Sequence, residues 1–102
     1  MENKELKIEQ KKEGNTLICI LSGWLDPNTS PELLNKLDLD NVTSLIVDMK
    51  NVEYVFSAGL RALLIMQRIV ETAGGSIKLI NVGETIKFIF EDTGLESMLE
   101  NK

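Results

Sequence analysis

The chain has 102 residues, which is enough for a single apolar core, and we expect one domain over residues 1–102. It has one cysteine, Cys19, and no histidine, which excludes an internal disulfide and removes the commonest general base and metal ligand. The net charge of −5 and the pI near 4.7 argue against nucleic acid as a direct partner.

The first segment with a regular pattern predicts a β-hairpin. Leu6 and Ile8 alternate with charged residues, as in a half-exposed strand, and residues 16–21 form an apolar run typical of a more buried strand. Gly14-Asn15 lies between them and predicts the turn. Ser22-Gly23 is expected to end the hairpin.

A loop and a short helix follow the hairpin. We expect the loop over residues 24–29 and a helix that begins at Ser30-Pro31-Glu32, with serine as N-cap, proline at N1 and an acid in the first turn. The helix is predicted to end near Leu37, before a connecting loop at 38–43.

The middle of the chain predicts a strand, a loop and the longest helix. Residues 45–47 form a continuous aliphatic run, typical of a central strand buried on both faces, and residues 50–56 are expected to form a loop. Apolar residues at helical spacing predict a helix over 57–73. Its expected buried stripe consists of Ala62, Ile65, Met66, Ile69, Val70 and Ala73.

The C-terminal part predicts one more strand and one more helix. Gly74-Gly75 is expected to stop the long helix, and residues 77–82 form another apolar strand. Ile86, Ile89 and Phe90 give the next helix an apolar face, which ends near Thr93-Gly94. Residues 95–99 are expected to add a last turn.

The predicted order is β-β-α-β-α-β-α. Each strand–helix–strand unit implies parallel strands, and the hairpin adds one antiparallel strand. We therefore expect an α/β domain with a mixed, mostly parallel sheet. The carboxyl ends of parallel strands carry the binding loops of such folds, so the loop at 24–29 and Ser57 should lie close together.

Ser57 is the most informative candidate residue. At about 100° per residue, Ser57, Arg61 and Leu64 share the face opposite the predicted buried stripe, with Leu60 on its flank. This mixed apolar and polar face beside a modifiable hydroxyl is typical of a surface that docks on another protein. The alternative is that Ser57 serves only as the N-cap of the helix, where serine is favoured for structural reasons.

Other side chains offer little catalytic chemistry. A serine hydrolase needs a base beside its serine and a G-x-S-x-G turn, and the chain has neither a histidine nor that motif. Asp26 and Asp48 are candidate paired carboxylates, but nothing in the sequence places them around one substrate. Gly59 is expected to allow close packing, and Cys19 to be a buried structural thiol. We expect no enzyme activity, no metal and no cofactor.

Three segments resemble the STAS-domain anti-sigma factor antagonists. Residues 54–64 (YVFSAGLRALL) look like the signature of this family around its serine. Residues 21–26 (LSGWLD) are similar to the family's L-x-G-x-L-D loop entry, and residues 82–95 (VGETIKFIFEDTGL) to its closing helix. The resemblance covers nearly the whole chain and implies a STAS-type fold.

The resemblance also implies a bacterial partner-switching role. Antagonists of this family bind an anti-sigma factor, often a serine kinase, and so free a sigma factor. The kinase phosphorylates the motif serine, which matches Ser57, and a PP2C-type phosphatase reverses the reaction. By the same correspondence, the docking surface would consist of Asp26, Pro27, Asn28, Thr29, Phe56, Ser57, Leu60, Arg61 and Leu64.

Phe56 is a departure from this family pattern. The position before the phosphorylated serine is commonly Asp or Ser, whereas here a large apolar ring precedes Ser57. Phe56 is expected to enlarge the docking patch or to fill a gap against the loop that begins at Trp24.

Two other function classes stay open from the sequence. The chain resembles a STAS module that can also serve as scaffold or accessory subunit of another assembly, such as a signalling complex or a lipid-transport ATPase. A nucleotide-sensing or enzymatic domain is the third class. No apolar run approaches the roughly 18 residues of a membrane span, so we expect a cytoplasmic protein without membrane insertion, as a monomer or weak dimer.

Overall fold

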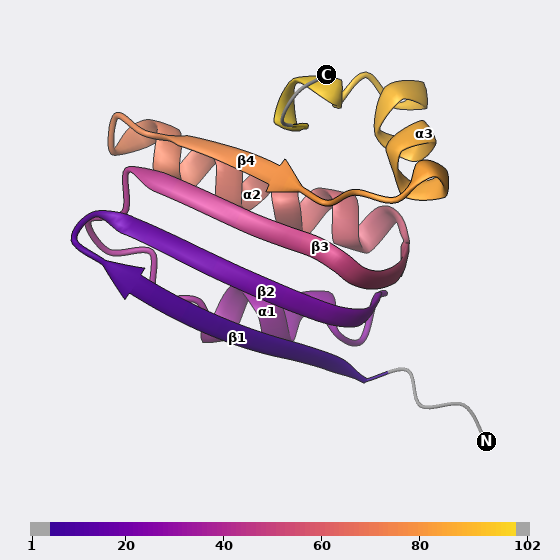
Figure 1. Cartoon of the computed structure of the whole chain (residues 1–102), viewed down its shortest axis with the longest axis horizontal. Coiled ribbons are helices and arrows are strands. Elements are labelled where there is room, and N and C mark those ends of the chain that lie inside the picture. Colours follow the sequence, from indigo (N-terminus) through magenta and orange to yellow (C-terminus); the bar gives the residue numbers. More distant parts are fainter. Residues whose placement is uncertain (1–4, 100–102) are drawn as a thin grey trace.

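Four strands form one mixed sheet in the order β1-β2-β3-β4 (Figure 1). The structure is a computed structural model that describes residues 5–99. The strands are β1 (Leu6–Glu13), β2 (Thr16–Leu25), β3 (Ser44–Val55) and β4 (Ser76–Ile80). The β1–β2 pair is antiparallel, and the β2–β3 and β3–β4 pairs are parallel. The predicted mixed, mostly parallel sheet is therefore confirmed.

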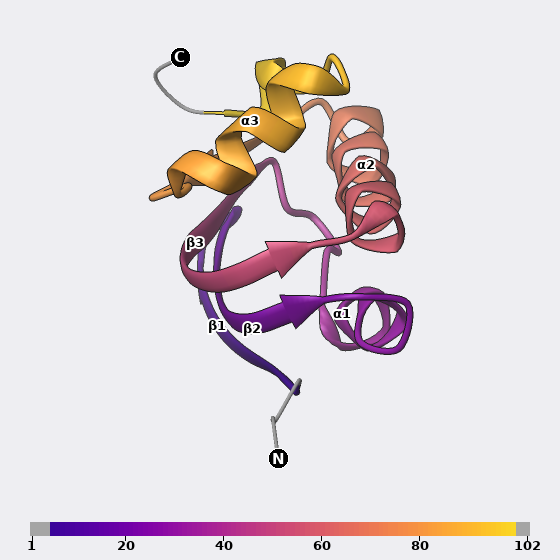
Figure 2. The ribbon, with the colours of Figure 1, turned by 90° about the vertical axis from the view of Figure 1, so that its right-hand side faces the viewer.

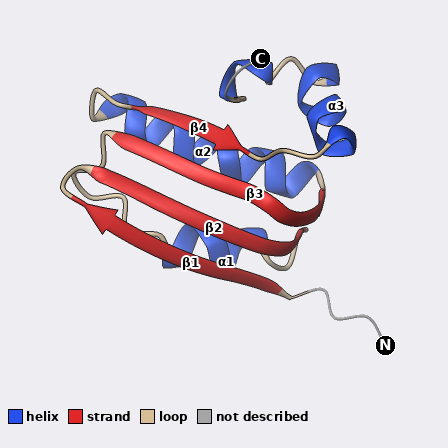
Figure 3. Ribbon diagram, in the orientation of Figure 1, coloured by secondary structure: helices blue, strands red, loops and turns tan. Residues whose placement is uncertain are grey.

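Two helices cover one face of this sheet. Helices α1 (Ser30–Lys36) and α2 (Ser57–Thr72) lie side by side behind it, as Figure 2 shows edge-on. Helix α3 (Glu84–Asp92) and the 3₁₀ turn η1 (Glu96–Met98) follow β4 (Figure 3). The order β-β-α-β-α-β-α is as predicted. The last turn, η1, lies within the predicted range 95–99.

The strands β2 and β3 are longer than the sequence predicts. The expected stop at Ser22-Gly23 was wrong, because β2 continues to Leu25 through register shifts on both sides of this dipeptide. Gly23 has φ +114, and a Cβ there would lie 2.1 Å from the Glu5 carbonyl oxygen. Glycine thus lets the strand bulge and continue.

The strand β3 was also misjudged in length and burial. The predicted loop at 50–56 is strand up to Val55, whereas β4 ends at Ile80, two residues before its predicted end. Burial on both faces was wrong as well. Leu45 and Val47 are buried under the helices, whereas Ile46 points to the other face and is half-buried. That face carries no helix within the described residues (Figure 1).

The buried face of α2 is rotated relative to the predicted stripe. Ala62, Met66 and Val70 are buried as expected, and Leu63 joins them. Ile65 and Ile69, expected in the core, are 38% and 44% exposed. Ile65 lines an open groove between α1 and α2 and so stays partly exposed. Ala73 is exposed beyond the last turn of the helix.

The helix ends follow the sequence with one correction. Helix α1 begins one residue earlier than predicted, with Thr29 as N-cap and Ser30 inside the first turn. The hydroxyl of Ser30 is buried and has no hydrogen-bond partner among residues 5–99. The predicted end near Leu37 is confirmed. Gly74, with φ +86, follows the end of α2, and α3 ends before Thr93, both as predicted.

Candidate functional site

The carboxyl ends of β2 and β3 place the predicted loop beside the first turn of α2. Leu25 pairs with Val55, and the backbone N–H of Phe56 donates to the Leu25 carbonyl at 2.8 Å. Gly59 allows this close approach, because a Cβ there would lie 2.7 Å from the Leu25 Cβ and 2.9 Å from the Leu25 oxygen. The expected proximity of the first loop and Ser57, and the packing role of Gly59, are confirmed.

Asp26 and Thr29 hold the loop together from the inside. The Asp26 Oδ1 accepts the backbone N–H groups of Asn28 and Thr29, both at 2.9 Å. The Thr29 hydroxyl accepts the Asp26 N–H at 3.0 Å and donates to the Trp24 carbonyl at 2.6 Å. Both side chains are buried as a result, whereas Pro27 and Asn28 are exposed. The loop therefore presents Pro27 and Asn28 to solvent.

Ser57 is exposed and does not cap its helix. The N-cap is Phe56, Ser57 is the first helical residue, and no side chain caps this end. Gly59 and Leu60 donate to the Phe56 carbonyl, so the amides of Ser57 and Ala58 have no main-chain acceptor among the described residues. The Ser57 hydroxyl likewise makes no hydrogen bond to another residue in the range 5–99. The explanation of Ser57 as a structural N-cap is thus wrong.

A cluster of three aromatic rings lies directly beside Ser57. Phe56 stacks on Trp24 with ring centroids 5.7 Å apart, and Tyr54 meets Phe56 edge-on at 4.8 Å. Tyr54 and Phe56 are each 37% exposed, and the Trp24 indole N–H donates to the Glu53 Oε1 at 3.1 Å. The expectation that Phe56 packs against the Trp24 segment is confirmed. Tyr54 was missed, although its spacing of two from Phe56 would place both on one face of a strand.

The exposed face of α2 carries the predicted residues. Arg61 is exposed, and Leu60 and Leu64 are partly exposed, as expected, while they also pack against the core. A groove of about 230 Å³ lies on the α1 side of the helix, between Leu34 and Ile65, with Arg61 in its lining. Ile65 was missed because the sequence pattern placed it in the core.

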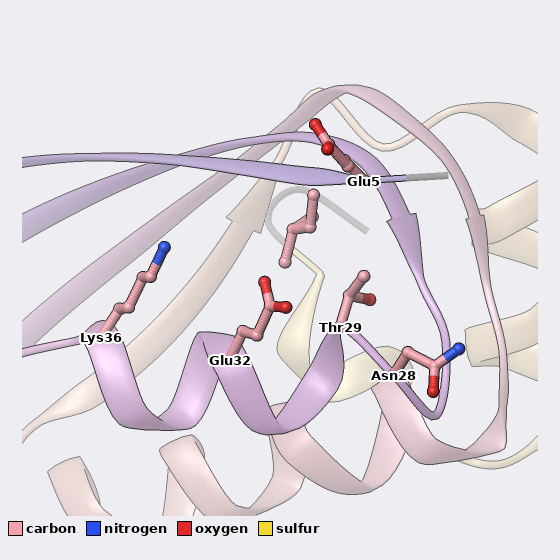
Figure 4. Close-up of a pocket in the computed structure, with 6 residues that line it drawn as sticks. Glu5, Asn28, Thr29, Glu32 and Lys36 are labelled. Carbon is pink, nitrogen blue, oxygen red and sulfur yellow. The ribbon is translucent and has the colours of Figure 1, made fainter. Parts of the chain in front are cut away.

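A second hollow lies on the other side of the loop. It has a volume of about 440 Å³ and opens between the start of β1 and α1 (Figure 4). Its lining is polar and includes Glu5, Thr29, Glu32 and Lys36. Among residues 5–99, no group of three or more acidic, cysteine or histidine side chains is placed to hold a metal ion.

The remaining candidate side chains have structural roles. Burial raises the pKa of the Cys19 thiol from its ordinary 9.0 to about 12, which keeps it protonated and unreactive. The Asp48 Oδ1 accepts from the Lys50 backbone N–H and the Asn81 side-chain amide, both at 3.0 Å. Asp48 therefore links the middle of β3 to the residue that follows β4. None of the helices within residues 5–99 is both long and apolar enough to cross a membrane.

Comparisons with known proteins agree with this geometry. The family model for the STAS domain matches residues 7–101. The anti-sigma-B factor antagonist of Bacillus subtilis is 28% identical over 97 residues, which cover 93% of this chain and 89% of that protein.

Solved structures share the same fold. The anti-sigma factor antagonist SpoIIAA in its unphosphorylated form superimposes with a TM-score of 0.82 at 21% identity, over 91% of this chain and 85% of that one. The phosphorylated form of SpoIIAA from Bacillus gives a TM-score of 0.74, again at 21% identity, over 91% of this chain and 88% of that one.

Proposed function

The chain belongs to the STAS-domain family, and from this premise we propose that it is an anti-sigma factor antagonist. In this proposal it binds an anti-sigma factor that is also a serine kinase, and so releases a sigma factor. The relative from Bacillus subtilis is itself named an anti-sigma-B factor antagonist, which supports the role. The protein acts by binding, in the cytoplasm of a bacterium, as a monomer or weak dimer.

The observation that carries the proposal is the state of the Ser57 hydroxyl. It is exposed, it caps no helix, and it belongs to a residue that directly follows Phe56 and lies one helical turn before Arg61. A serine with a purely structural role would be expected to accept a hydrogen bond from a free backbone N–H at the helix end. A free hydroxyl in the middle of a mixed apolar and polar surface is what a modification-controlled interface needs.

We propose that phosphorylation of Ser57 switches this interface off. The kinase transfers the γ-phosphoryl group of ATP to the Ser57 oxygen, which loses its proton, and ADP leaves. A PP2C-type phosphatase hydrolyses the ester and restores the hydroxyl. The phosphate adds about −1.5 to −2 charge at the centre of the contact surface. Taking that dianion out of water against a partner costs on the order of several kcal/mol, so binding is lost.

The fold should tolerate the same phosphate. The amides of Ser57 and Ala58 are available at the start of α2, and the described first turn of this helix contains no acidic side chain. A phosphate there meets the positive end of the helix dipole without a competing carboxylate in that turn. Phosphorylation thus changes binding without unfolding the domain.

Affinity capture from host cells tests the proposal. Wild type, Ser57→Ala and Ser57→Asp serve as baits, and mass spectrometry reports phosphate on Ser57 of the recovered wild type. We expect wild type and Ser57→Ala to capture a serine kinase of the anti-sigma type, and Ser57→Asp to lose it. If all three baits capture one partner and Ser57 is never modified, the switch is wrong, and a scaffold role in another assembly replaces it.

A further inference from the structure

The groove between α1 and α2 contains a single charged side chain among its described lining residues. Its walls are built mainly from apolar groups, with Pro31 and Leu34 on α1 and Ala58 and Ile65 on α2. Arg61 supplies the charge. Arg61 is exposed and makes no ion pair with any residue from 5 to 99. This arginine is therefore available to a group that arrives from outside.

Arg61 also lies one helical turn from Ser57. Residues four apart on a helix are neighbours on its surface, separated by about 6 Å along the axis and about 40° around it. A phosphate on Ser57 would thus lie within reach of the Arg61 guanidinium, whose planar fork matches phosphate oxygens. The chain's other arginine, Arg68, is exposed on the same side of α2 but lies about 16 Å from Ser57 along the axis.

The carboxylates near this turn are engaged elsewhere. Asp26 accepts the amides of its own loop, and Glu53 accepts the indole N–H of Trp24. The first turn of α2 contains no acid. A phosphate on Ser57 would thus be the strongest acceptor close to Arg61.

We infer that phosphorylation of Ser57 acts through Arg61: the phosphate binds the guanidinium and withdraws it from the groove. The inference rests on the proposed function. In the unmodified protein, Arg61 pairs with a carboxylate on an apolar segment of the partner, and this segment occupies the groove. The apolar walls and the lone positive charge define this occupant by complementarity. Phosphorylation then takes away the cation that pairs with the partner's carboxylate. It also places a dianion beside that carboxylate.

The first test needs no partner and no kinase. Phosphoserine is incorporated at position 57 by genetic code expansion, and ³¹P NMR follows the second ionisation of the phosphate, whose ordinary pKa is about 6. We expect Arg61→Gln to raise this pKa by about 0.5 unit relative to wild type, because an adjacent cation favours the dianion. Arg68→Gln is the matched control and should leave it unchanged, since Arg68 lies beyond the screening length of about 8 Å. An unchanged phosphate pKa in Arg61→Gln would overturn the inference.

The second test concerns the unmodified protein. Arg61→Glu and Arg68→Glu serve as capture baits, with circular dichroism as the check that both fold. We expect Arg61→Glu to lose the anti-sigma factor and Arg68→Glu to retain it. Equal capture by both would overturn the pairing of Arg61 with a partner carboxylate. If wild type captures no anti-sigma factor, the proposed function fails, whereas the phosphate titration still decides whether Arg61 binds the phosphate.

Discussion

The ring of Phe56 stacks on the indole of Trp24, with their planes 23° apart, and so ties the residue before Ser57 to the end of the neighbouring strand. This contact joins two segments that are 32 positions apart in the sequence. It fixes the entry of α2 next to the loop at 26–29. The position that departs from the usual family pattern is thus used for packing beside the candidate phosphorylation site.

Removing the Phe56 ring should loosen this corner of the molecule. We expect Phe56→Ala to lower the free energy of unfolding by about 1 kcal/mol, because an aromatic pair contributes about 0.5–1.5 kcal/mol beyond its buried area. Trp24 is the chain's only tryptophan, so its fluorescence reports the site directly and should shift to longer wavelength. Urea denaturation followed by Trp24 fluorescence measures the free energy of unfolding, and the emission spectrum of the folded protein shows the shift.

Phe88 provides the control for this experiment. Its ring is 65% exposed on α3 and is not part of the aromatic cluster. Phe88→Ala should leave the Trp24 emission unchanged and alter stability by less than about 0.5 kcal/mol. If Phe56→Ala left the Trp24 emission as in wild type, the stacked contact would be wrong.

Gly59 should not tolerate a methyl group, although it lies in a helix. Alanine usually stabilises a helix interior by up to about 1 kcal/mol relative to glycine. Here the new Cβ would overlap Leu25, and the overlap involves backbone as well as side chain. We expect Gly59→Ala to cost about 1–3 kcal/mol in chemical denaturation. A variant more stable than wild type would show that α2 and β2 are less closely packed than described.

Met66 and Ile69 test which face of α2 is buried. Met66 is fully buried, so Met66→Ala should lower the free energy of unfolding by about 2–5 kcal/mol. Ile69 is 44% exposed, so Ile69→Ala should cost less than about 1 kcal/mol, helped by the better helix propensity of alanine. Comparable losses in the two variants would indicate that Ile69 is buried, as the sequence pattern predicts.

Cys19 should make the protein less stable at alkaline pH. Its pKa is about 12 in the folded protein and close to 9.0 in the unfolded chain, so only the unfolded thiol ionises between these values. The unfolded state then binds fewer protons, and stability falls as pH rises above about 9, by up to about 1.4 kcal/mol per pH unit. Urea denaturation across this pH range should show that the free energy of unfolding falls less steeply with pH in Cys19→Ala than in wild type. Equal slopes for the two proteins would contradict the burial of the thiol.

Local signals in the sequence were sufficient for the element order and for most helix ends. The Gly14-Asn15 turn, the stop at Gly74 and the short aliphatic strand cores are each encoded in a few adjacent residues. Ser57 could be singled out in the same way, because the residues of its motif follow one another in the sequence. These features depend little on the rest of the fold, which is why they could be predicted.

The features that were missed depend on how separate elements meet. Tyr54 joins the aromatic cluster because β3 continues to Val55 and pairs Tyr54 with Trp24, whereas the local pattern predicted a loop there. The exposure of Ile65 depends on the open groove between α1 and α2, which two separate segments form. This groove also contains Arg61, and it could not be foreseen from the periodicity of α2 alone.

The central claim is that a phosphate on Ser57 weakens binding to the anti-sigma factor. The most direct measurement is the Kd of the captured anti-sigma factor for purified protein that carries either serine or phosphoserine at position 57. We predict a Kd at least about 100-fold higher for the phosphoserine form, since each 1.4 kcal/mol of desolvation and repulsion is a factor of ten. The same Kd for both forms would contradict the account.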